Sequence, residues 1–252
     1  MTEGIVLSEE TYRQLIDMKM FGLAASFNEY LEQTDKDELS FEERFGMMVD
    51  REHTERQERR LKYRLNKAKL REEASVEDID YRHPRGLDRS VIQRLSICKW
   101  VSSSEHIIIT GKTGLGKTWL ACALANKACR QGYTSLYVRV PRILQDLYIA
   151  HADGTYPKMM NKLAKPDVLI LDDLGLSPLR DTERRDLLEV IEDRQGRRST
   201  IVTSQLKVKH WHEVIGEPTI ADAILDRLVS GAHRIDLSGK SMRPKKRGRT
   251  KK

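Results

Sequence analysis

Apolar residues near the start of the chain recur at steps of three and four, which is the spacing of an amphipathic helix. Between Ser8, a suitable N-cap, and about Gln33, this apolar face consists of Ile16, Met20, Leu23, Phe27, Tyr30 and Leu31. A second helix is expected from Ser40, because Ser40-Phe41-Glu42-Glu43 has the pattern of a capping box. The pattern therefore predicts an N-terminal helical domain over residues 1–75.

The second half of the second helix, residues 51–72, is strongly charged, with more basic than acidic side chains. One interpretation is a solvated helix held by pairs such as Glu52 with Arg56 and Glu55 with Arg59. The other is a basic face that follows the phosphate backbone of DNA. The candidate DNA contacts on this helix are Arg59, Arg60 and Lys62. The pattern leaves both interpretations open.

Beyond residue 92 the pattern changes to short apolar runs separated by helical stretches. The runs expected to form strands are 106–110, 134–140, 167–171 and 199–203, and the helical stretches are 119–130, 142–164 and 181–195. Strands that alternate with helices predict a parallel sheet with helices on both faces. We therefore expect an α/β domain over 93–238, preceded by a linker over 76–92 and followed by a basic tail over 239–252.

Composition and charge narrow the class of protein. Hydrophobic residues are 39% and charged residues 33% of the chain, which is compatible with a compact fold and a charged surface. The net charge of +7 favours a polyanionic partner such as nucleic acid. Cys98, Cys122 and Cys129 lack the spacing of a metal or redox site, and their odd number argues against a disulfide framework. Without an export signal or an apolar run of about 20 residues, we expect a cytoplasmic protein that does not enter a membrane.

Residues 111–118 match the phosphate-binding pattern G-x-x-x-x-G-K-[ST] between a predicted strand and a predicted helix. The candidate nucleotide-binding residues are Gly111, Lys112, Thr113, Gly114, Leu115, Gly116, Lys117 and Thr118. Loop amides and the helix N-terminus would bind the phosphates. Lys117 would reach the β- and γ-phosphates, and the Thr118 hydroxyl would ligate Mg²⁺. The sequence thus predicts ATP and Mg²⁺ as cofactors.

Polar residues follow two of the predicted strands. Asp172 and Asp173 come directly after the run 167–171. Asp172 is expected to hold Mg²⁺, and Asp173 is expected to orient or deprotonate the attacking water. The alternative for Asp173 is a cap on the following turn. Ser204 and Gln205 follow the run 199–203, and they are candidates for hydrogen bonds to the water or the γ-phosphate. The alternative for these two is that they are ordinary loop residues.

The order of phosphate loop, Asp-Asp strand end and polar strand end resembles the AAA+ ATPases of the initiator and helicase-loader branch. The segments 40–55, 78–82, 203–206, 210–213 and 221–228 narrow the resemblance to the IstB family, the ATP-binding helper proteins of insertion-sequence transposition. This resemblance extends from about residue 10 to 243. It implies a P-loop AAA+ parallel-sheet domain with an N-terminal helical domain and without a full C-terminal helical lid.

The resemblance also implies roles for individual residues. Arg227, in Asp-Ala-Ile-Leu-Asp-Arg, is similar in position to the arginine finger that an AAA+ subunit gives to its neighbour's ATP. Arg243 resembles the second sensor, an arginine that contacts the γ-phosphate in its own subunit. Many AAA+ ATPases have Glu where this chain has Asp173, and the shorter side chain suggests slow, regulatory ATP hydrolysis.

The function implied by the resemblance is an ATP-dependent regulator of DNA transposition. Such a protein oligomerises on double-stranded DNA, selects or remodels the target and recruits a partner transposase. Further candidate DNA contacts are Lys158, Lys162, Lys245, Lys246 and Arg247. The alternative for Lys158 and Lys162 is solvated helix charge, and the alternative for the three tail residues is a disordered, solubilising end. Other functions left open are a helicase loader of the DnaC type, a small-molecule kinase and a DNA-binding scaffold gated by a nucleotide without useful hydrolysis.

Overall fold

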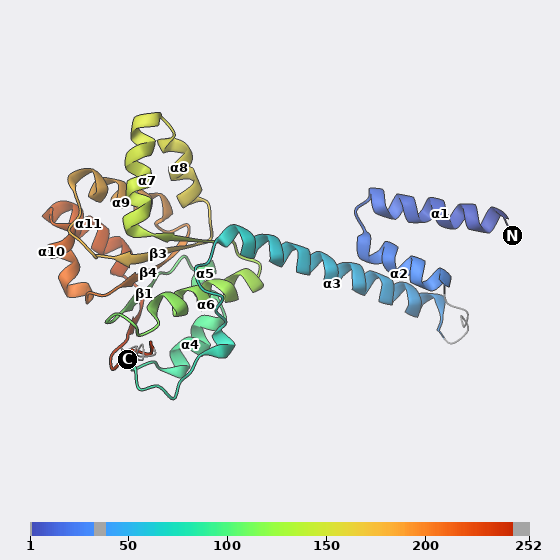
Figure 1. Cartoon of the computed structure of the whole chain (residues 1–252), viewed down its shortest axis with the longest axis horizontal. Coiled ribbons are helices and arrows are strands. Elements are labelled where there is room, and N and C mark those ends of the chain that lie inside the picture. Colours follow the sequence, from blue (N-terminus) through green and yellow to red (C-terminus); the bar gives the residue numbers. More distant parts are fainter. Residues whose placement is uncertain (1, 33–38, 244–252) are drawn as a thin grey trace, which may run out of the picture. The chain divides into compact units, whose positions relative to one another are not determined.

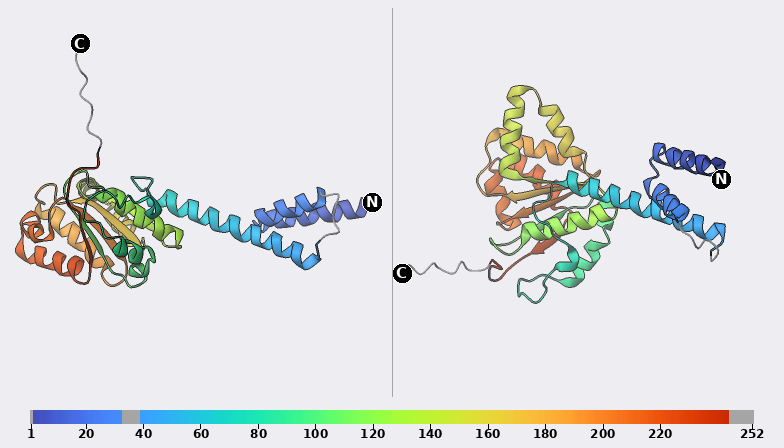
Figure 2. Two further views of the ribbon diagram at one scale, coloured as in Figure 1. Left: turned by 90° about the horizontal axis from the view of Figure 1, so that it is seen from below. Right: turned by 45° about the vertical axis from the view of Figure 1, so that its right-hand side comes forward.

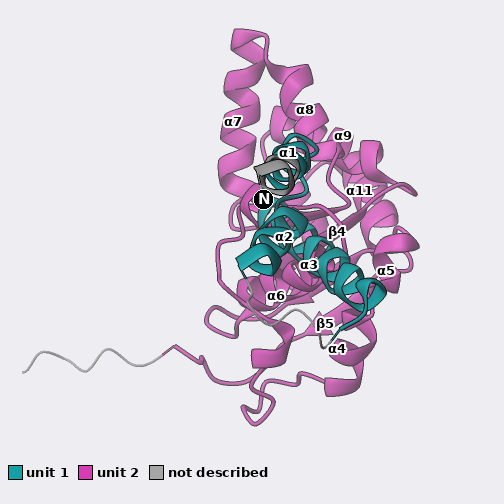
Figure 3. Cartoon of the chain, turned by 90° about the vertical axis from the view of Figure 1, so that its right-hand side faces the viewer, with its two compact units in different colours: residues 1–63 teal, residues 64–252 magenta. Residues whose placement is uncertain are grey.

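The structure is a computed structural model that describes residues 2–32 and 39–243, with residues 2–7 described by their backbone alone. The chain divides into two compact units, Met1–Tyr63 and Arg64–Lys252, which are coloured separately in Figure 3. The division falls within one long helix, so the two units are treated separately below.

The first unit is helical. It contains α1 (Thr2–Asp17), α2 (Phe21–Glu32) and most of α3 (Phe41–Ala68). The single helix expected from residue 8 to 33 was wrong, because the chain turns after Asp17 and Lys19 adopts a left-handed backbone with φ 59°. The capping box was confirmed: the Ser40 N–H donates to Glu43 Oε2 at 2.9 Å, and the Glu43 N–H donates to Ser40 Oγ at 3.2 Å.

Glu52 joins α2 to α3 inside the first unit. This buried carboxylate accepts a hydrogen bond from the Gly22 N–H at 2.8 Å and pairs with Arg56 at 2.7 Å. The predicted pair of Glu52 with Arg56 is therefore present. Glu55 pairs with Arg51 instead of Arg59, and Arg59 lies 3.4 Å from Glu52. Part of the charge on α3 thus belongs to an internal network.

The described part of the second unit contains a five-stranded parallel sheet (Figure 1). Its strands are β1 (Ile107–Thr110), β2 (Ser135–Arg139), β3 (Val168–Leu174), β4 (Ser199–Ser204) and β5 (His233–Asp236). Their order is β2-β3-β4-β1-β5. Strand β5 was not predicted, because His, Arg and Asp fill three of its four positions and hide the apolar pattern of a strand.

Helices cover both faces of this sheet (Figure 2). They are α4 (Arg89–Ser96), α5 (Lys99–Ser102), α6 (Lys117–Arg130), α7 (Val140–Asp153), α8 (Tyr156–Ala164), α9 (Asp181–Arg194), α10 (Trp211–Ile215) and α11 (Pro218–Val229), with short 3₁₀ helices η1 (Val76–Asp78) and η2 (Val208–His210). Ile107 and Ile109 pack in one core with α4 and α6, whereas Ile108 packs in a second core with α7, α9 and α11. The alternation along β1 places a core on each face.

Two predicted boundaries differ from the structure. The stretch 142–164 forms two helices, because Gly154 ends α7 in a left-handed conformation with φ 77°. Residues 64–75, assigned by sequence to the N-terminal domain, lie in the second compact unit. There, Arg64 Nε donates to the Cys129 carbonyl at 2.9 Å, and Ala68 is buried. The predicted linker also packs on this unit, since Arg85 is only 2% exposed.

His106, just before β1, makes the stability of the second unit sensitive to pH. Its ring is buried, and Nδ1 accepts a hydrogen bond from the Thr200 N–H at 3.1 Å. Burial lowers the pKa of His106 below its ordinary value. The folded ring therefore stays neutral at a pH where the unfolded ring gains a proton, so stability is present above about pH 6.5 and is lost as the pH falls below it.

Replacing His106 with Asn keeps an acceptor for the Thr200 N–H and removes the titrating group. We expect the urea midpoint of the variant to fall less than that of the wild type between about pH 7.5 and about pH 5.5. Expressed as free energy of unfolding, the difference between the two proteins can change by at most about 1.4 kcal/mol per pH unit, because only one proton is involved. Equal pH dependence in both proteins would show that His106 is not the cause.

Candidate nucleotide-binding site

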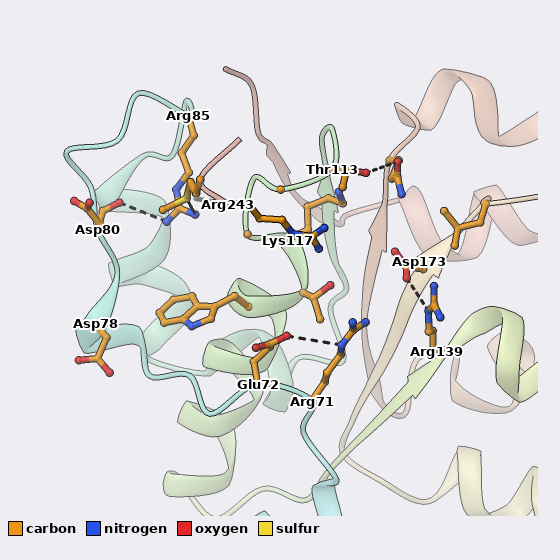
Figure 4. A pocket seen from close by; sticks show the side chains of 17 residues that line it. Arg71, Glu72, Asp78, Asp80, Arg85, Thr113, Lys117, Arg139, Asp173 and Arg243 are labelled. Atoms are coloured by element: carbon orange, nitrogen blue, oxygen red, sulfur yellow. Dashed lines mark hydrogen bonds and ion pairs between the residues drawn. The ribbon is translucent and has the colours of Figure 1, made fainter. Parts of the chain in front are cut away.

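A cavity of about 690 Å³ opens beside the carboxyl ends of β2, β3 and β4, where ligands of parallel sheets gather (Figure 4). Four segments of the second unit supply its wall. They are the phosphate loop with the start of α6 (Thr113, Gly114, Gly116, Lys117, Thr118, Trp119), the segment after α3 (Arg71, Glu72, Asp78, Asp80, Arg85), the strand ends (Arg139, Asp173, Leu176, Gln205) and the last described residues (Met242, Arg243).

The phosphate loop is held in a bent conformation that glycine permits. Gly114 and Gly116 have φ angles of 85° and 83°, in the left-handed region. A Cβ at Gly111 would lie 2.5 Å from the Leu237 carbonyl oxygen, so a side chain cannot be added there without moving the backbone. Lys117 Nζ donates to the carbonyl oxygens of Gly111 and Lys112 at 2.6 and 3.1 Å. Burial lowers the pKa of Lys117, and Asp173 and Asp172 oppose this shift.

Asp172 and Thr118 lie side by side. Asp172 is fully buried, and its Oδ1 accepts hydrogen bonds from the hydroxyls of Thr118 at 2.8 Å and Thr203 at 2.6 Å. A carboxylate next to a hydroxyl fits Mg²⁺, which binds oxygen and is usually held by one or two protein ligands together with water and phosphates. Within residues 2–32 and 39–243, no group of three or more His, Cys, Asp and Glu side chains could hold a metal. Water and phosphate oxygens would therefore fill the other positions around a magnesium ion held here.

Asp173 occupies a strained position at the cavity wall. Its φ is 64°, and the pairing of β3 with β4 is irregular between Leu171 and Leu174. Arg139 Nε donates to Asp173 Oδ2 at 2.8 Å, and the carboxylate side chain is 16% exposed (Figure 4). Both side chains line the cavity. Strained backbone of this kind is common at functional sites.

The remaining predicted residues of the strand ends and the C-terminal segment differ in position. Gln205 lines the cavity and accepts a hydrogen bond from Thr113 Oγ1 at 2.8 Å. Ser204 does not reach the cavity wall: it is the last residue of β4, fully buried, and its hydroxyl donates to the Leu174 carbonyl at 2.7 Å. Arg243 lines the cavity, and its positive charge contributes to the lowered pKa of Lys117.

Arg227 lies on α11, outside the wall of this cavity. Its Nη1 donates to the Ala223 carbonyl at 2.9 Å, and its Nη2 pairs with Glu192 at 2.7 Å. The side chain remains 30% exposed. Arg227 therefore does not line the cavity of its own chain, and a contact with the cavity of a second copy would require this exposed side of α11.

The basic candidates for DNA contact are distributed over both units. Arg60 and Lys62 are exposed on α3, where Arg59 is engaged by Glu52. Lys158 and Lys162 are exposed on α8. The remaining candidates, Lys245, Lys246 and Arg247, lie outside the described residues.

Several residues of the cavity were not found by sequence reasoning. Arg139 ends β2, and it could have been proposed because the carboxyl ends of parallel strands meet at one edge. Arg71 and Arg85 come from segments with no strand, helix start or motif to mark them. Their position depends on tertiary packing of the segment after α3.

A five-stranded parallel sheet in the described residues, with a phosphate loop after β1 and a carboxylate pair in β3, defines the class of P-loop proteins with the AAA+ fold. The chain belongs to the family of IstB-like ATP binding proteins, whose model matches residues 13–250. The predicted fold class and family are therefore confirmed. In the described part of the chain, helices that combine the length and apolar character needed to cross a membrane are absent.

Similar proteins agree with this assignment. The insertion sequence ATP-binding protein y4pL of Sinorhizobium fredii is 49% identical over 242 residues, which cover 96% of this chain and 99% of that protein. The IS21 ATP-binding protein of Pseudomonas aeruginosa is 32% identical over 230 residues, which cover 91% and 87%. The crystal structure of DnaI has a TM-score of 0.57 at 23% identity, covering 66% of this chain and 92% of that one. The DnaI likeness supports the fold alone.

Proposed function

We propose that the protein is an ATPase that regulates DNA transposition. It binds ATP with Mg²⁺, oligomerises on double-stranded DNA, selects or remodels the target site and recruits a partner transposase. The observation that carries this proposal is a cavity lined by Lys117 and Thr118, with the buried Asp172 carboxylate bonded to the Thr118 hydroxyl behind its wall. The relatives of the chain are named as insertion sequence ATP-binding proteins.

The predicted site residues at and behind the cavity wall have separate roles in this reaction. The loop amides and Lys117 bind the phosphates, and Thr118 with Asp172 would hold Mg²⁺. When bound, Mg²⁺ neutralises charge on the β- and γ-phosphates. Asp173 orients the attacking water, with Gln205 and Arg243 on the same wall as further contacts for the γ-phosphate.

Hydrolysis is proposed to be slow and regulatory. Asp173 is one methylene shorter than glutamate, so its carboxylate reaches less far into the cavity. Arg139 also donates to Asp173 at 2.8 Å, and the lone pair used in that bond is not available to water. ATP turnover would then time an assembly step instead of driving rapid movement.

DNA binding is proposed to rest on backbone phosphates. Arg60, Lys62, Lys158 and Lys162 are exposed cations, and the chain has a net charge of +7. Contacts of this kind carry no base code and weaken strongly with salt. The initiator DnaA, solved with AMPPCP and single-stranded DNA, shares the fold with a TM-score of 0.54 at 16% identity, which supports combining nucleotide and DNA on this fold.

Helicase loading is the second candidate, because the DnaC helicase loader has the same fold, with a TM-score of 0.53 at 19% identity. The insertion sequence relatives are much more similar in sequence, and this similarity favours transposition. Both candidates predict the same ATP site, so the partner protein distinguishes them. On the transposition proposal, a partner transposase should bind the chain, and a replicative helicase should not.

Sedimentation velocity of the full chain with short duplex DNA tests the assembly. We expect large particles with ATP and Mg²⁺, their absence without nucleotide, and their loss when Arg227 is replaced by Ala, because a trans arginine stabilises the bound triphosphate across the interface. Arg197→Ala is a matched control, since Arg197 is exposed next to the amino end of β4. A monomer or dimer indifferent to nucleotide and DNA would contradict the assembly model.

A further inference from the structure

The buried carboxylate of Asp172 has a second oxygen that the proposed metal site does not use. Oδ1 faces the hydroxyls of Thr118 and Thr203, as described above. Oδ2 accepts a hydrogen bond from the Tyr137 hydroxyl at 2.7 Å and lies 3.8 Å from Nη1 of Arg71. The two oxygens therefore have different partners, and in the described part of the chain the cation paired with Asp172 is Arg71.

Arg71 and Tyr137 act on the same oxygen. A hydrogen bond with Tyr137 is the largest cause of the raised pKa of Arg71, and the charge of Asp172 adds to it. Burial, followed by the bond to Asp172, raises the pKa of Tyr137, so the hydroxyl keeps its proton and remains a donor. The guanidinium also lies 3.7 Å from Glu72, and both side chains line the cavity (Figure 4).

The backbone around Arg71 is fixed by packing. Helix α3 ends at Ala68, and Lys69 turns the chain with φ 49°. Ala68 and Ala74 are buried, and Leu70 packs against the core that contains α6. The side chain of Arg71 itself is 48% exposed, so it projects from an anchored segment into the cavity. Helix α3 begins in the first unit and ends in the second, and Arg71 follows its end after Lys69 and Leu70.

We propose that Arg71 is a positioning residue of the ATP site. Together with Tyr137 it holds Oδ2 of Asp172, which leaves Oδ1 to Thr118 and the metal. It also places a fixed positive charge beside the metal-binding carboxylate. This inference rests on the proposed function, because it requires ATP and Mg²⁺ to bind at this cavity.

A fixed cation at this place has opposite effects on the two ligands. It attracts the phosphates of ATP, and it repels Mg²⁺ from the carboxylate that it partly neutralises. Arg71 therefore supports nucleotide binding without metal and reduces the gain in affinity that Mg²⁺ provides. Loss of the charge should weaken binding most when metal is absent.

The experiment is an equilibrium titration of the full chain with a fluorescent ATP analogue, once in EDTA and once in excess Mg²⁺. The measured quantity is the ratio of the Kd in EDTA to the Kd in Mg²⁺. For Arg71→Ala we expect this ratio to rise about tenfold. Arg71→Lys keeps the charge and should restore the ratio to within about twofold of the wild type. Arg94→Ala, at an exposed position of α4 outside the cavity wall, should leave the ratio unchanged.

A double-mutant cycle tests whether Arg71 and Tyr137 share a target. Tyr137→Phe keeps the ring and removes the donor to Oδ2. Because both side chains act on one oxygen, the effect of the double variant on the ratio should differ from the product of the single effects. Independent effects would overturn the shared role.

Other outcomes separate this inference from the proposed function. If Arg71→Ala changes both Kd values by the same factor, or if Arg71→Lys behaves as Arg71→Ala, the electrostatic role of Arg71 is wrong. If the wild type fails to bind the analogue in Mg²⁺, the proposed ATP site itself is wrong.

Discussion

Replacing Lys117 with alanine is expected to weaken binding of ATP with Mg²⁺ by about 100-fold. In the structure Nζ donates to two carbonyl oxygens of the phosphate loop, at 2.6 and 3.1 Å. With ATP bound, the ammonium group exchanges these neutral acceptors for charged phosphate oxygens, and charge-assisted hydrogen bonds contribute about 1.5–3 kcal/mol each. The two neutral hydrogen bonds that are lost contribute about 0.5–1.5 kcal/mol each, so the net gain is about 2.7 kcal/mol, which corresponds to the expected factor.

The stability of the Lys117→Ala variant should change little. Alanine suits the first turn of α6, and the carbonyl oxygens of Gly111 and Lys112 can turn to water at the open cavity. Isothermal titration calorimetry gives the affinity, and thermal unfolding gives the stability. Lys99→Ala, at an exposed position of α5, is the matched control for loss of one positive charge. Unchanged affinity in Lys117→Ala would show that the phosphates bind elsewhere.

Motifs carried by consecutive residues could be predicted from the sequence. The loop 111–118 bends because its glycines tolerate left-handed backbone, and this property is local. Asp172 and Asp173 could be placed near the loop because the carboxyl ends of parallel strands share an edge. The start of α3 was predicted for the same reason, since a capping box involves residues only three apart.

Features that depend on tertiary packing could not be predicted. Arg71 reaches Asp172 across about a hundred positions of sequence, and no pattern in either segment points to the other. In the sequence, Tyr137 fits the pattern of an ordinary strand residue. Its hydrogen bond to Asp172 arises only because β2 pairs with β3 in the folded chain. Strand β5 is polar in sequence and becomes a strand through its pairing with β1.

Ser204 lies in strand β4 and not at the cavity wall, because the strand is one residue longer than predicted. The apolar pattern predicts a strand that ends at residue 203, which would place both Ser204 and Gln205 beyond the strand, at the site. Strand β4 includes Ser204, and the Ser204 N–H and carbonyl belong to a strand flanked by β3 and β1. Its hydroxyl is consumed by the Leu174 carbonyl and the Leu206 N–H. Gln205, one residue later, is free of the strand and lines the cavity.

Replacing Arg194 with alanine is expected to cause the largest loss of stability among the variants proposed for this chain. This residue lies away from the ATP site. This last residue of α9 is 1% exposed. Its guanidinium donates to the carbonyl oxygens of Leu163, Ala164, Pro166 and Ser199 and to the hydroxyl of Thr200. Burial lowers the pKa of Arg194 to about 9, because the charged form is removed from water. The carbonyl dipoles offset that cost and connect the end of α8 to the amino ends of β3 and β4.

Arg194→Ala would leave several buried carbonyl groups without donors, and each such loss costs about 1–3 kcal/mol. We expect the free energy of unfolding to fall by about 4 kcal/mol, measured by urea denaturation of the full chain. The free energy of unfolding of Arg194→Lys should lie between those of the wild type and Arg194→Ala, because a single ammonium group cannot reach all the acceptors. Arg197→Ala, exposed three residues later, should change stability by less than about 0.5 kcal/mol.

The same variant separates stability from nucleotide binding. The acceptors of Arg194 lie at the amino ends of the strands, and the ATP cavity lies at the carboxyl ends. Below its unfolding temperature, Arg194→Ala should therefore bind ATP with an affinity within about twofold of the wild type, since sites far apart and without shared partners behave independently. A large loss of affinity in the folded variant would show that the amino ends of β3 and β4 are coupled to Asp172 through the strands themselves.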